Sequence, residues 1–243
     1  RKLHERLNYL RNLEEKKEQV LSSIEEQGKL TEELKKKILA AETMVVVEDL
    51  YRPYRPKRRT RAMIAKEKGL EPLALAIFAQ TGEDPAELAQ DYIDPEKGVE
   101  TLEDALSGAS DIIAEMISDD ADIRKALRLK MERSAIITVC AEDEEKERVY
   151  QLYYSFQSPV SRLLNHQILA INRGEKEGIL KPAIALPGSD GLAVVRRAAL
   201  KPTAYVCPVV RAAADDAYER LIFPSLQREV RSDLSEKAYT AAI

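Results

Sequence analysis

Seven basic residues lie between Tyr51 and Lys66, and no acidic residue interrupts them. They are Arg52, Arg55, Lys57, Arg58, Arg59, Arg61 and Lys66. Arginine and lysine bind phosphate through charge and hydrogen bonds, so residues 51–66, called the basic strip below, suit a nucleic-acid backbone. Tyr51 and Tyr54 interleave with the first arginines and offer π faces on which a base or a guanidinium could stack.

Two prolines shape the start of the basic strip. Pro53 and Pro56 lack a backbone N–H, and each disfavours the α conformation in the residue before it. We therefore expect the strip to begin as a stiff, solvated, extended segment rather than a helix, with the side chains of Arg52 and Arg55 held outward.

The alternative for the basic strip is a loop whose cations pair with the chain's own acidic helices. Between Glu83 and Asp122 there are fourteen acids against the single Lys97, although the net charge is only −4. An acidic region repels phosphate, so nucleic acid would be confined to the basic side. The acidic side would face solvent or a basic protein surface.

Composition restricts the class of protein. Charged residues make up 33% of the 243 residues and glycine is scarce, which is typical of a helix-rich chain. No apolar run approaches the roughly 20 residues of a membrane span, and no signal peptide opens the sequence, so we expect a cytoplasmic protein without membrane contact. Two cysteines, Cys140 and Cys207, cannot form a four-ligand zinc site, and the two histidines, His4 and His166, add little to that prospect, so we expect no metal or cofactor.

The spacing of apolar residues predicts a mainly α fold, a multi-helix bundle. The expected helices are 3–28 and 32–41, which form a hairpin, and then one after Thr60 ending at Gly69, one from Pro72, one after Asp84, one after Thr101, and 122–133. Residues 44–47 are compatible with a buried helix turn or with a strand.

The second half of the chain is less regular. Residues 135–139 are ambiguous, 143–156 are expected to be helical, and prolines with β-branched residues indicate short strands and loops within 179–210. Helices are expected again over 215–223, 224–231 and 233–243.

A helix-turn-helix is a candidate element at 60–80. Ala65 would lie where two helices meet, Gly69 would make the turn, and Leu75 would close the small core. The same spacing recurs at Ala170, Gly174 and Leu180, so the pattern discriminates poorly.

No motif indicates an enzyme. Carboxylates are plentiful but lie on polar helix faces, without convergent histidines that would assign an acid and a base. The segment 172–178 lacks the Walker and dinucleotide patterns, and we interpret it as a helix end or tight turn.

Four ordered segments resemble the bacterial transcription accessory protein Tex family. They are EDLYRPYRPKRRTRAMIAKEKGLEPLA at 48–74, the helical hairpin at 7–43, NHQILAINRGEKEGIL at 165–180 and DDAYERLIFPSLQREVRSDLSEKA at 215–238. The resemblance implies a transcription protein in which an N-terminal helical region precedes an RNase H-like domain, helix-hairpin-helix elements and an RNA-binding OB-fold. This chain would be the helical region, a fragment of a longer polypeptide.

We therefore predict three parts: a hairpin at 1–48, a central helical domain at 49–210, and C-terminal helices at 211–243 leading to the RNase H-like domain. The predicted function is a non-enzymatic nucleic-acid-binding scaffold in transcription, which contacts DNA or RNA phosphates through the basic strip. The alternative is a protein-interaction scaffold, whose strip docks internally and whose acidic helices bind proteins of the transcription machinery.

Overall fold

The structure is a computed structural model, and it describes residues 2–56, 58–142, 148–203 and 205–241. It is mainly α with one small sheet, as the sequence predicts. The chain forms two compact units, Arg1–Ala79 with Glu83–Arg124, and Gln80–Gly82 with Lys125–Ile243. These boundaries differ from the division at 48 and 210 expected from the sequence.

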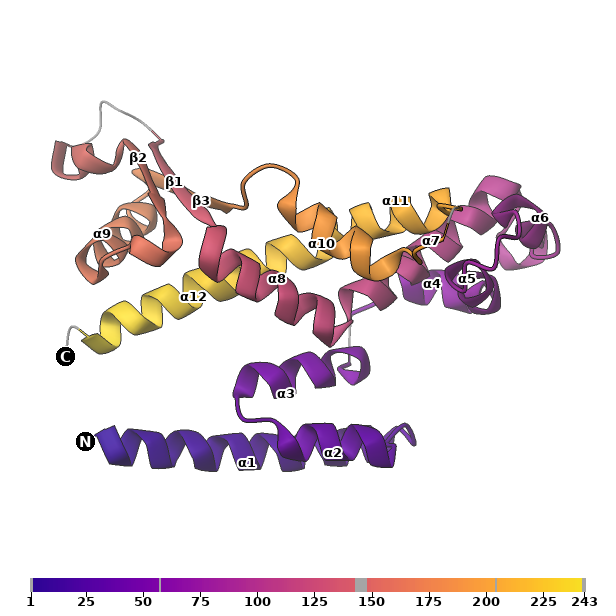
Figure 1. The fold of residues 1–243 in the computed structure, drawn as a ribbon, viewed down its shortest axis with the longest axis horizontal. Helices are drawn as coiled ribbons and strands as arrows, with labels where there is room; N and C mark the ends of the chain where they lie inside the picture. The colour runs from indigo at the N-terminus through magenta and orange to yellow at the C-terminus, as the bar shows by residue number, and fades with distance from the viewer. Residues whose placement is uncertain (1, 57, 143–147, 204, 242–243) are drawn as a thin grey trace. The chain divides into compact units, whose positions relative to one another are not determined.

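The first unit begins with the predicted hairpin, α1 (Lys2–Glu26) and α2 (Glu32–Ala40), to which α3 (Met44–Tyr51) adds a third helix (Figure 1). Residues 44–47 are therefore helical and not a strand. The Thr31 and Thr43 hydroxyls accept the N–H groups that begin α2 and α3, which fixes both starts. Apolar side chains of the three helices form one cluster: Leu13, Val20, Ile24, Ile38, Ala41 and Val47.

The remainder of the first unit is built around one long helix. Its elements are η1 (Arg52–Tyr54), α4 (Arg61–Glu67), α5 (Glu71–Phe78), α6 (Pro85–Gln90), η2 (Pro95–Lys97) and α7 (Leu102–Ser118). Thr101 and Asp104 form a capping box at the start of α7, and α4, α5 and α6 each contact α7. The predicted starts at Thr60, Asp84 and Thr101 are confirmed.

Gly108 allows α7 to approach the turn after α4. A Cβ at this position would lie 2.3 Å from Leu70 Cδ1 and 3.4 Å from the Ala65 Cβ. Leu70 and Ala65 are both buried, so they have little room to move. The glycine is therefore needed for the packing that supports α4.

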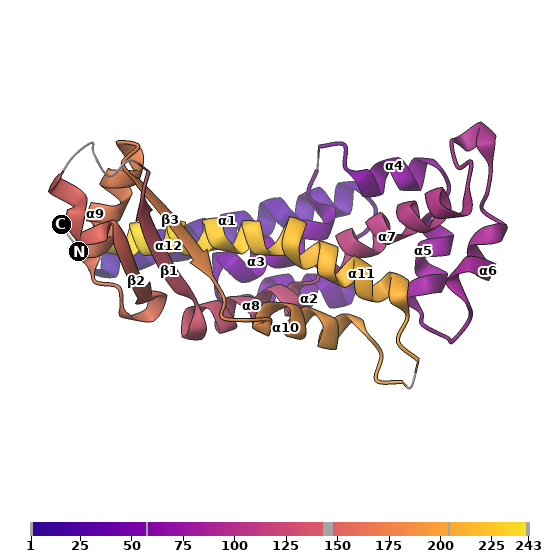
Figure 2. The ribbon, with the colours of Figure 1, turned by 90° about the horizontal axis from the view of Figure 1, so that it is seen from above.

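The second unit begins within α8 (Ala121–Ser134) and contains an antiparallel sheet of β1 (Ile136–Ala141), β2 (Ser155–Pro159) and β3 (Leu180–Ala185). The strand order is β2-β1-β3, with β1 in the middle (Figure 2). Its other elements are η3 (Arg148–Tyr153), η4 (Val160–Arg162), α9 (Asn165–Lys176), α10 (Asp190–Ala199), α11 (Pro208–Asp216), the π-helical segment η5 (Ala217–Ile222) and α12 (Phe223–Ala241).

Pro182 and Gln227 close the outer edge of β3. The Glu142 N–H donates to the Ile179 carbonyl, so this pair of opposite residues is hydrogen-bonded. Hydrogen-bonded and non-hydrogen-bonded pairs alternate along an antiparallel ladder, and the backbone polar groups of Pro182 and Ile184 therefore point away from β1. Pro182 has no donor to expose there, and the Gln227 amide donates to the Ile184 carbonyl at 2.6 Å. This arrangement limits pairing of the edge with another strand.

Several predictions for the second half of the chain are wrong. Residues 148–156 form a 3₁₀ segment and part of a strand instead of a helix, and 143–147 lie outside the described residues. Within 179–210 the strand 180–185 is confirmed, but 190–199 is helical because the flanking prolines bracket this segment without interrupting it. The spacing at Ala170, Gly174 and Leu180 joins a helix to a strand, and 172–178 is a helix end, as interpreted.

The predicted helix breaks near Pro224 are also wrong. Helix α11 begins at Pro208, not Asp215, because proline fits the first turn of a helix. A proline inside a helix clashes with the carbonyl four residues earlier, which is that of Arg220. The π-helical segment relieves this clash, since the Phe223 N–H donates to Tyr218, five residues back, and the helix continues into α12.

Candidate nucleic-acid interface

The beginning of the basic strip is attached to the hairpin. The Tyr51 hydroxyl lies 2.9 Å from Ser23 Oγ, and Lys16 Nζ lies 5.8 Å from the centre of the Tyr51 ring. Tyr54 also packs against the hairpin cluster, and its carbonyl accepts a hydrogen bond of 2.8 Å from Gln27. Both tyrosines thus have a packing role, and stacking on a base stays a prediction.

The conformation at the first proline contradicts the expected extended segment. Residues 52–54 form a 3₁₀ turn, and Arg52 is helical because its N–H still donates to Glu48 at the end of α3. The Arg52 side chain is half-buried rather than held outward. Arg55 is extended before Pro56, as predicted, and its side chain is 61% exposed.

Glu48 neutralises part of the positive charge at this end of the strip. Its carboxylate lies 2.8 Å from Lys16 and 3.8 Å from Arg55. The first arginines are therefore close to the hairpin and to an acid of the chain itself. Residues 51–55 are called the anchored part below.

Residues 58–66 are called the open part, and their side chains are differently placed. The side chains of Arg58, Arg59, Arg61 and Lys66 are exposed. Arg59 pairs with Glu67 at 2.7 Å, and Lys66 lies 3.8 Å from Glu71. Within the described part of the chain, Arg58 and Arg61 form no ion pair. Lys57 lies outside the described residues.

Thr60 fixes the start of α4 on α7. Its hydroxyl oxygen accepts the Met63 N–H at 3.1 Å, and its hydroxyl group donates to Glu115 at 2.9 Å. This double role orients the first turn of α4, from which the Arg61 side chain projects. The open part is thus held on a packed helix pair.

The candidate helix-turn-helix consists of α4, a short turn and α5. Gly69 has a positive φ of 76°, and the Leu70 N–H donates to Ala65, which closes the end of α4 in a Schellman motif. Lys68 and Lys97 lie beside this turn and were not among the predicted site residues. Lys68 could have been predicted as a site residue, because it lies seven residues after Arg61 and therefore on the same helix face.

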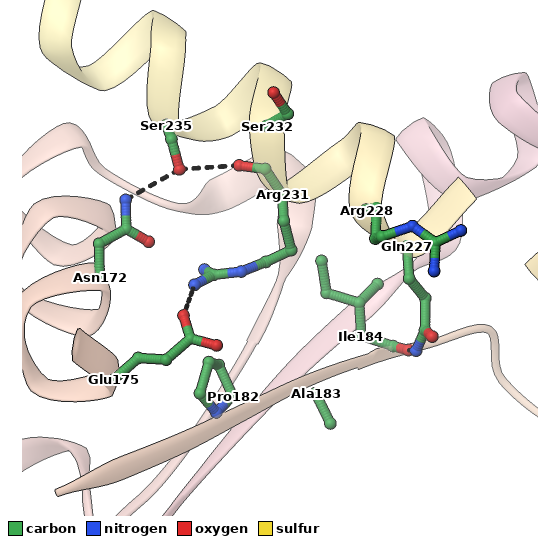
Figure 3. Close-up of a pocket in the computed structure, with 10 residues that line it drawn as sticks. All are labelled: Asn172, Glu175, Pro182, Ala183, Ile184, Gln227, Arg228, Arg231, Ser232 and Ser235. Atoms are coloured by element: carbon green, nitrogen blue, oxygen red, sulfur yellow. Dashed lines mark hydrogen bonds and ion pairs between the residues drawn. The ribbon is translucent and has the colours of Figure 1, made fainter. Parts of the chain in front are cut away.

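A first pocket among the described residues of the second unit, of about 620 Å³, is lined by α9, β3 and α12 (Figure 3). Its polar groups mostly bind one another: Asn172 donates to Ser235 at 2.8 Å, and Arg231 pairs with Glu175. Such mutual pairing serves to join α9 to α12.

The second pocket, of about 400 Å³, lies between α8, η4, α9 and α12. Arg128 binds Glu229 here at 3.0 Å. Partial burial raises the pKa of the Asp233 carboxyl above its usual 3.8, and the charges of Glu229 and Glu236 add to this effect.

Among the residues that the structure describes, no group of three or more His, Cys, Asp or Glu side chains could hold a metal ion. None of the helices described is long and apolar enough to cross a membrane.

The fold and the strip together define a helical module with cationic side chains on its first unit. The Tex central region-like family model matches residues 80–243, after the basic strip. A Bacillus subtilis relative, YdcI, is 43% identical over 99% of this chain, and the Bordetella pertussis protein named Protein tex is 44% identical over 76% of it. The human protein named S1 RNA-binding domain-containing protein 1 is 30% identical over 98% of it.

The chain belongs to the Tex family, as the resemblance of its four segments predicts. It spans only part of these relatives, 34% of the Bacillus protein, 24% of the Bordetella protein and 25% of the human protein.

Proposed function

We propose that this chain is a non-enzymatic, cytoplasmic scaffold that binds the phosphate backbone of DNA or RNA during transcription. The observation that carries the proposal is the exposure of Arg58 and Arg61, which form no ion pair with any residue that the structure describes. The names of two relatives support the context, one a transcriptional accessory protein and one an S1 RNA-binding domain-containing protein.

The remaining cations of the open part are available at small cost. Arg59 and Lys66 are paired with Glu67 and Glu71, and all four side chains are substantially exposed. Exposed ion pairs contribute about 0 to 1 kcal/mol, so a phosphate can replace the carboxylate. Together with Arg58 and Arg61, these residues give the open part four cations that can neutralise phosphates of a polyanion.

Helix α5 indicates what kind of contact to expect. In a DNA-binding helix-turn-helix the second helix reads base edges with arginine, lysine, asparagine or glutamine side chains. The exposed residues of α5 are Glu71, Pro72 and Leu75, of which only Glu71 could contact a base edge, by accepting a hydrogen bond from a cytosine amino group. We therefore propose contact with the backbone, independent of sequence, rather than base recognition.

A fluorescence-anisotropy titration across a salt series tests this function. Log affinity should fall linearly with log salt, with a slope of about −0.7 to −0.9 for each phosphate neutralised. Arg58→Glu/Arg59→Glu should weaken binding equally on duplexes of different sequence. Lys35→Glu/Lys36→Glu makes the same formal change from positive to negative on exposed positions of α2 and is the matched control. Equal affinity of parent and Arg58/Arg59 variant at low salt would reject the proposal.

A protein-interaction scaffold is the second candidate. The anchored part favours it, because Tyr51 and Tyr54 pack on the hairpin and Arg55 faces Glu48. In this case the acidic surface of α6 and α7 would bind a basic protein of the transcription machinery. This candidate would be favoured over the first if the chain bound no nucleic acid at any salt concentration but did bind a basic protein of the transcription machinery.

A further inference from the structure

Two lysines outside the basic strip meet at the turn after α4. A Cβ on Gly69 would lie 3.6 Å from Lys97 Nζ, and a Cβ on Gly98 would lie 3.6 Å from Lys68 Cε and 3.8 Å from its Nζ. The Lys97 side chain therefore ends beside the turn at Gly69, next to Lys68, and the Lys68 side chain ends beside the turn at Gly98, next to Lys97.

The two turn glycines make this crossing possible. Gly69 has φ +76° and Gly98 has φ +80°, and both are exposed. The absence of side chains leaves the surface between the turns open for the two lysine stems. Lys97 is exposed and Lys68 is half-buried.

The charge of this pair is not neutralised within the part of the chain that the structure describes. Neither Lys68 nor Lys97 forms an ion pair there. The neighbouring acids are otherwise engaged: Glu67 binds Arg59, Glu71 faces Lys66, and the Asp94 carboxylate accepts the Glu96 N–H. Two like charges held near each other repel, and an anion between them would remove this repulsion.

The lysine pair continues the open part along α4. Arg61 and Lys68 are seven residues apart and so lie on one face of the helix, separated by about 10 Å at 1.5 Å per residue. The phosphates of one DNA strand follow each other by about 3.4 Å along the axis. Where α4 is parallel to the axis of a duplex, the two positions span about three nucleotide steps. Ile64, 37% exposed, lies between them on the same side.

We propose that Lys68 and Lys97 form a second phosphate-binding point, so that one phosphodiester backbone follows α4 from its N-terminal arginines to the turn before α5. This proposal rests on the proposed function, because it extends the same interface. It assigns a path along α4 to the bound backbone and adds one residue from η2, Lys97, which is distant in the sequence.

The test compares Lys68→Gln/Lys97→Gln with the parent chain. Loss of this one phosphate-binding point should lower affinity about 5- to 8-fold at 0.1 M salt and make the salt slope less steep by about 0.7 to 0.9. The matched control is Lys35→Gln/Lys36→Gln, which removes the same charge from exposed positions of α2 in the same unit. Random-sequence DNA duplex and single-stranded RNA are the two probes, and an effect confined to one identifies the bound form.

A conservative variant separates charge from structure. Lys68→Arg/Lys97→Arg should keep affinity within about twofold of the parent, because arginine also binds phosphate. If the glutamine pair is no weaker than its control, or if the arginine pair loses as much affinity as the glutamine pair, the second phosphate point does not exist. If Arg58→Glu/Arg59→Glu still weakens binding in those cases, the proposed function stands without it.

Discussion

The anchored and the open parts of the basic strip both contain arginines, but in different surroundings. In the anchored part, Tyr51 and Tyr54 pack on the hairpin, and Arg55 faces Glu48. In the open part, Arg58 and Arg61 are exposed and form no ion pair with the residues described.

The difference shows that charge density along a sequence does not measure the charge available to a ligand. Aromatic residues interleaved with arginines can stack on bases, but here they also supply apolar area to a small core. The hairpin holds the first part, and α7 supports the second through Thr60 and Gly108. A variant in the hairpin core should therefore destabilise the anchored part, and a variant in α7 should destabilise the open part.

The largest effect is expected at the hairpin core. Ile24 is fully buried, so Ile24→Ala should lower the free energy of unfolding by about 2 to 5 kcal/mol. Hydrogen exchange should accelerate in α1 to α3 and much less in α4 to α7. Leu39→Ala, at a position 50% exposed on α2, is the control and should have little effect. Equal acceleration in all these helices would show that the two parts share one support.

Gly108→Val should disturb the other support. The new side chain would overlap Leu70, and overpacking of this kind costs about 1 to 3 kcal/mol. Exchange should now accelerate in α4, α5 and α7. Ser107→Val places the same side chain on the exposed face of α7 and should be nearly neutral. If the two variants are equally stable, α7 does not approach α4 as closely as described.

Tyr51→Phe should have a smaller effect. It removes the hydroxyl that binds Ser23, which contributes about 0.5 to 1.5 kcal/mol to stability. The phenyl ring remains available for packing, so nucleic-acid affinity should not change. Tyr239→Phe, at an exposed tyrosine of α12, provides the comparison in thermal unfolding. A loss of affinity without loss of stability would instead assign Tyr51 a direct contact with nucleic acid.

Asp233→Asn is expected to have the smallest effect, and its sign depends on pH. The pKa of this carboxyl is raised in the folded state, so folding favours the protonated form. Ionisation therefore destabilises the fold as pH rises from below 3.8 through the raised pKa, and this cost is complete at neutral pH. The variant should be slightly more stable than the parent at pH 7, and the difference should disappear in acid. Urea unfolding at several pH values measures it, and a variant less stable at pH 7 would contradict this account.

The sequence was sufficient for most helices of the first unit. Thr31, Thr60 and Thr101 each precede an apolar helical pattern, and each caps a helix in the structure. These helix starts are predictable because the capping hydrogen bonds that fix them join residues close together in the sequence. The β3 strand was also predictable from the β-branched and proline-rich composition around it.

The failures have non-local causes. The helix at 190–199 contains Val194 and Val195, β-branched residues that favour strands in isolation, and it packs against α11 in the structure. Pro224 is accommodated by a π-helical turn, which no residue pattern in the sequence predicted. At the candidate site, the prediction identified the charged residues but not Glu48 as a partner, nor Lys97 beside Lys68, since both depend on tertiary contacts.

One measurement compares the two parts of the strip directly. Arg58→Gln/Arg61→Gln and Arg52→Gln/Arg55→Gln each remove two positive charges, and both are titrated with the same nucleic acid across one salt series. The account predicts that the first variant loses about 25- to 60-fold in affinity at 0.1 M salt and that the second loses much less. An equal or larger loss for the Arg52/Arg55 variant would contradict it.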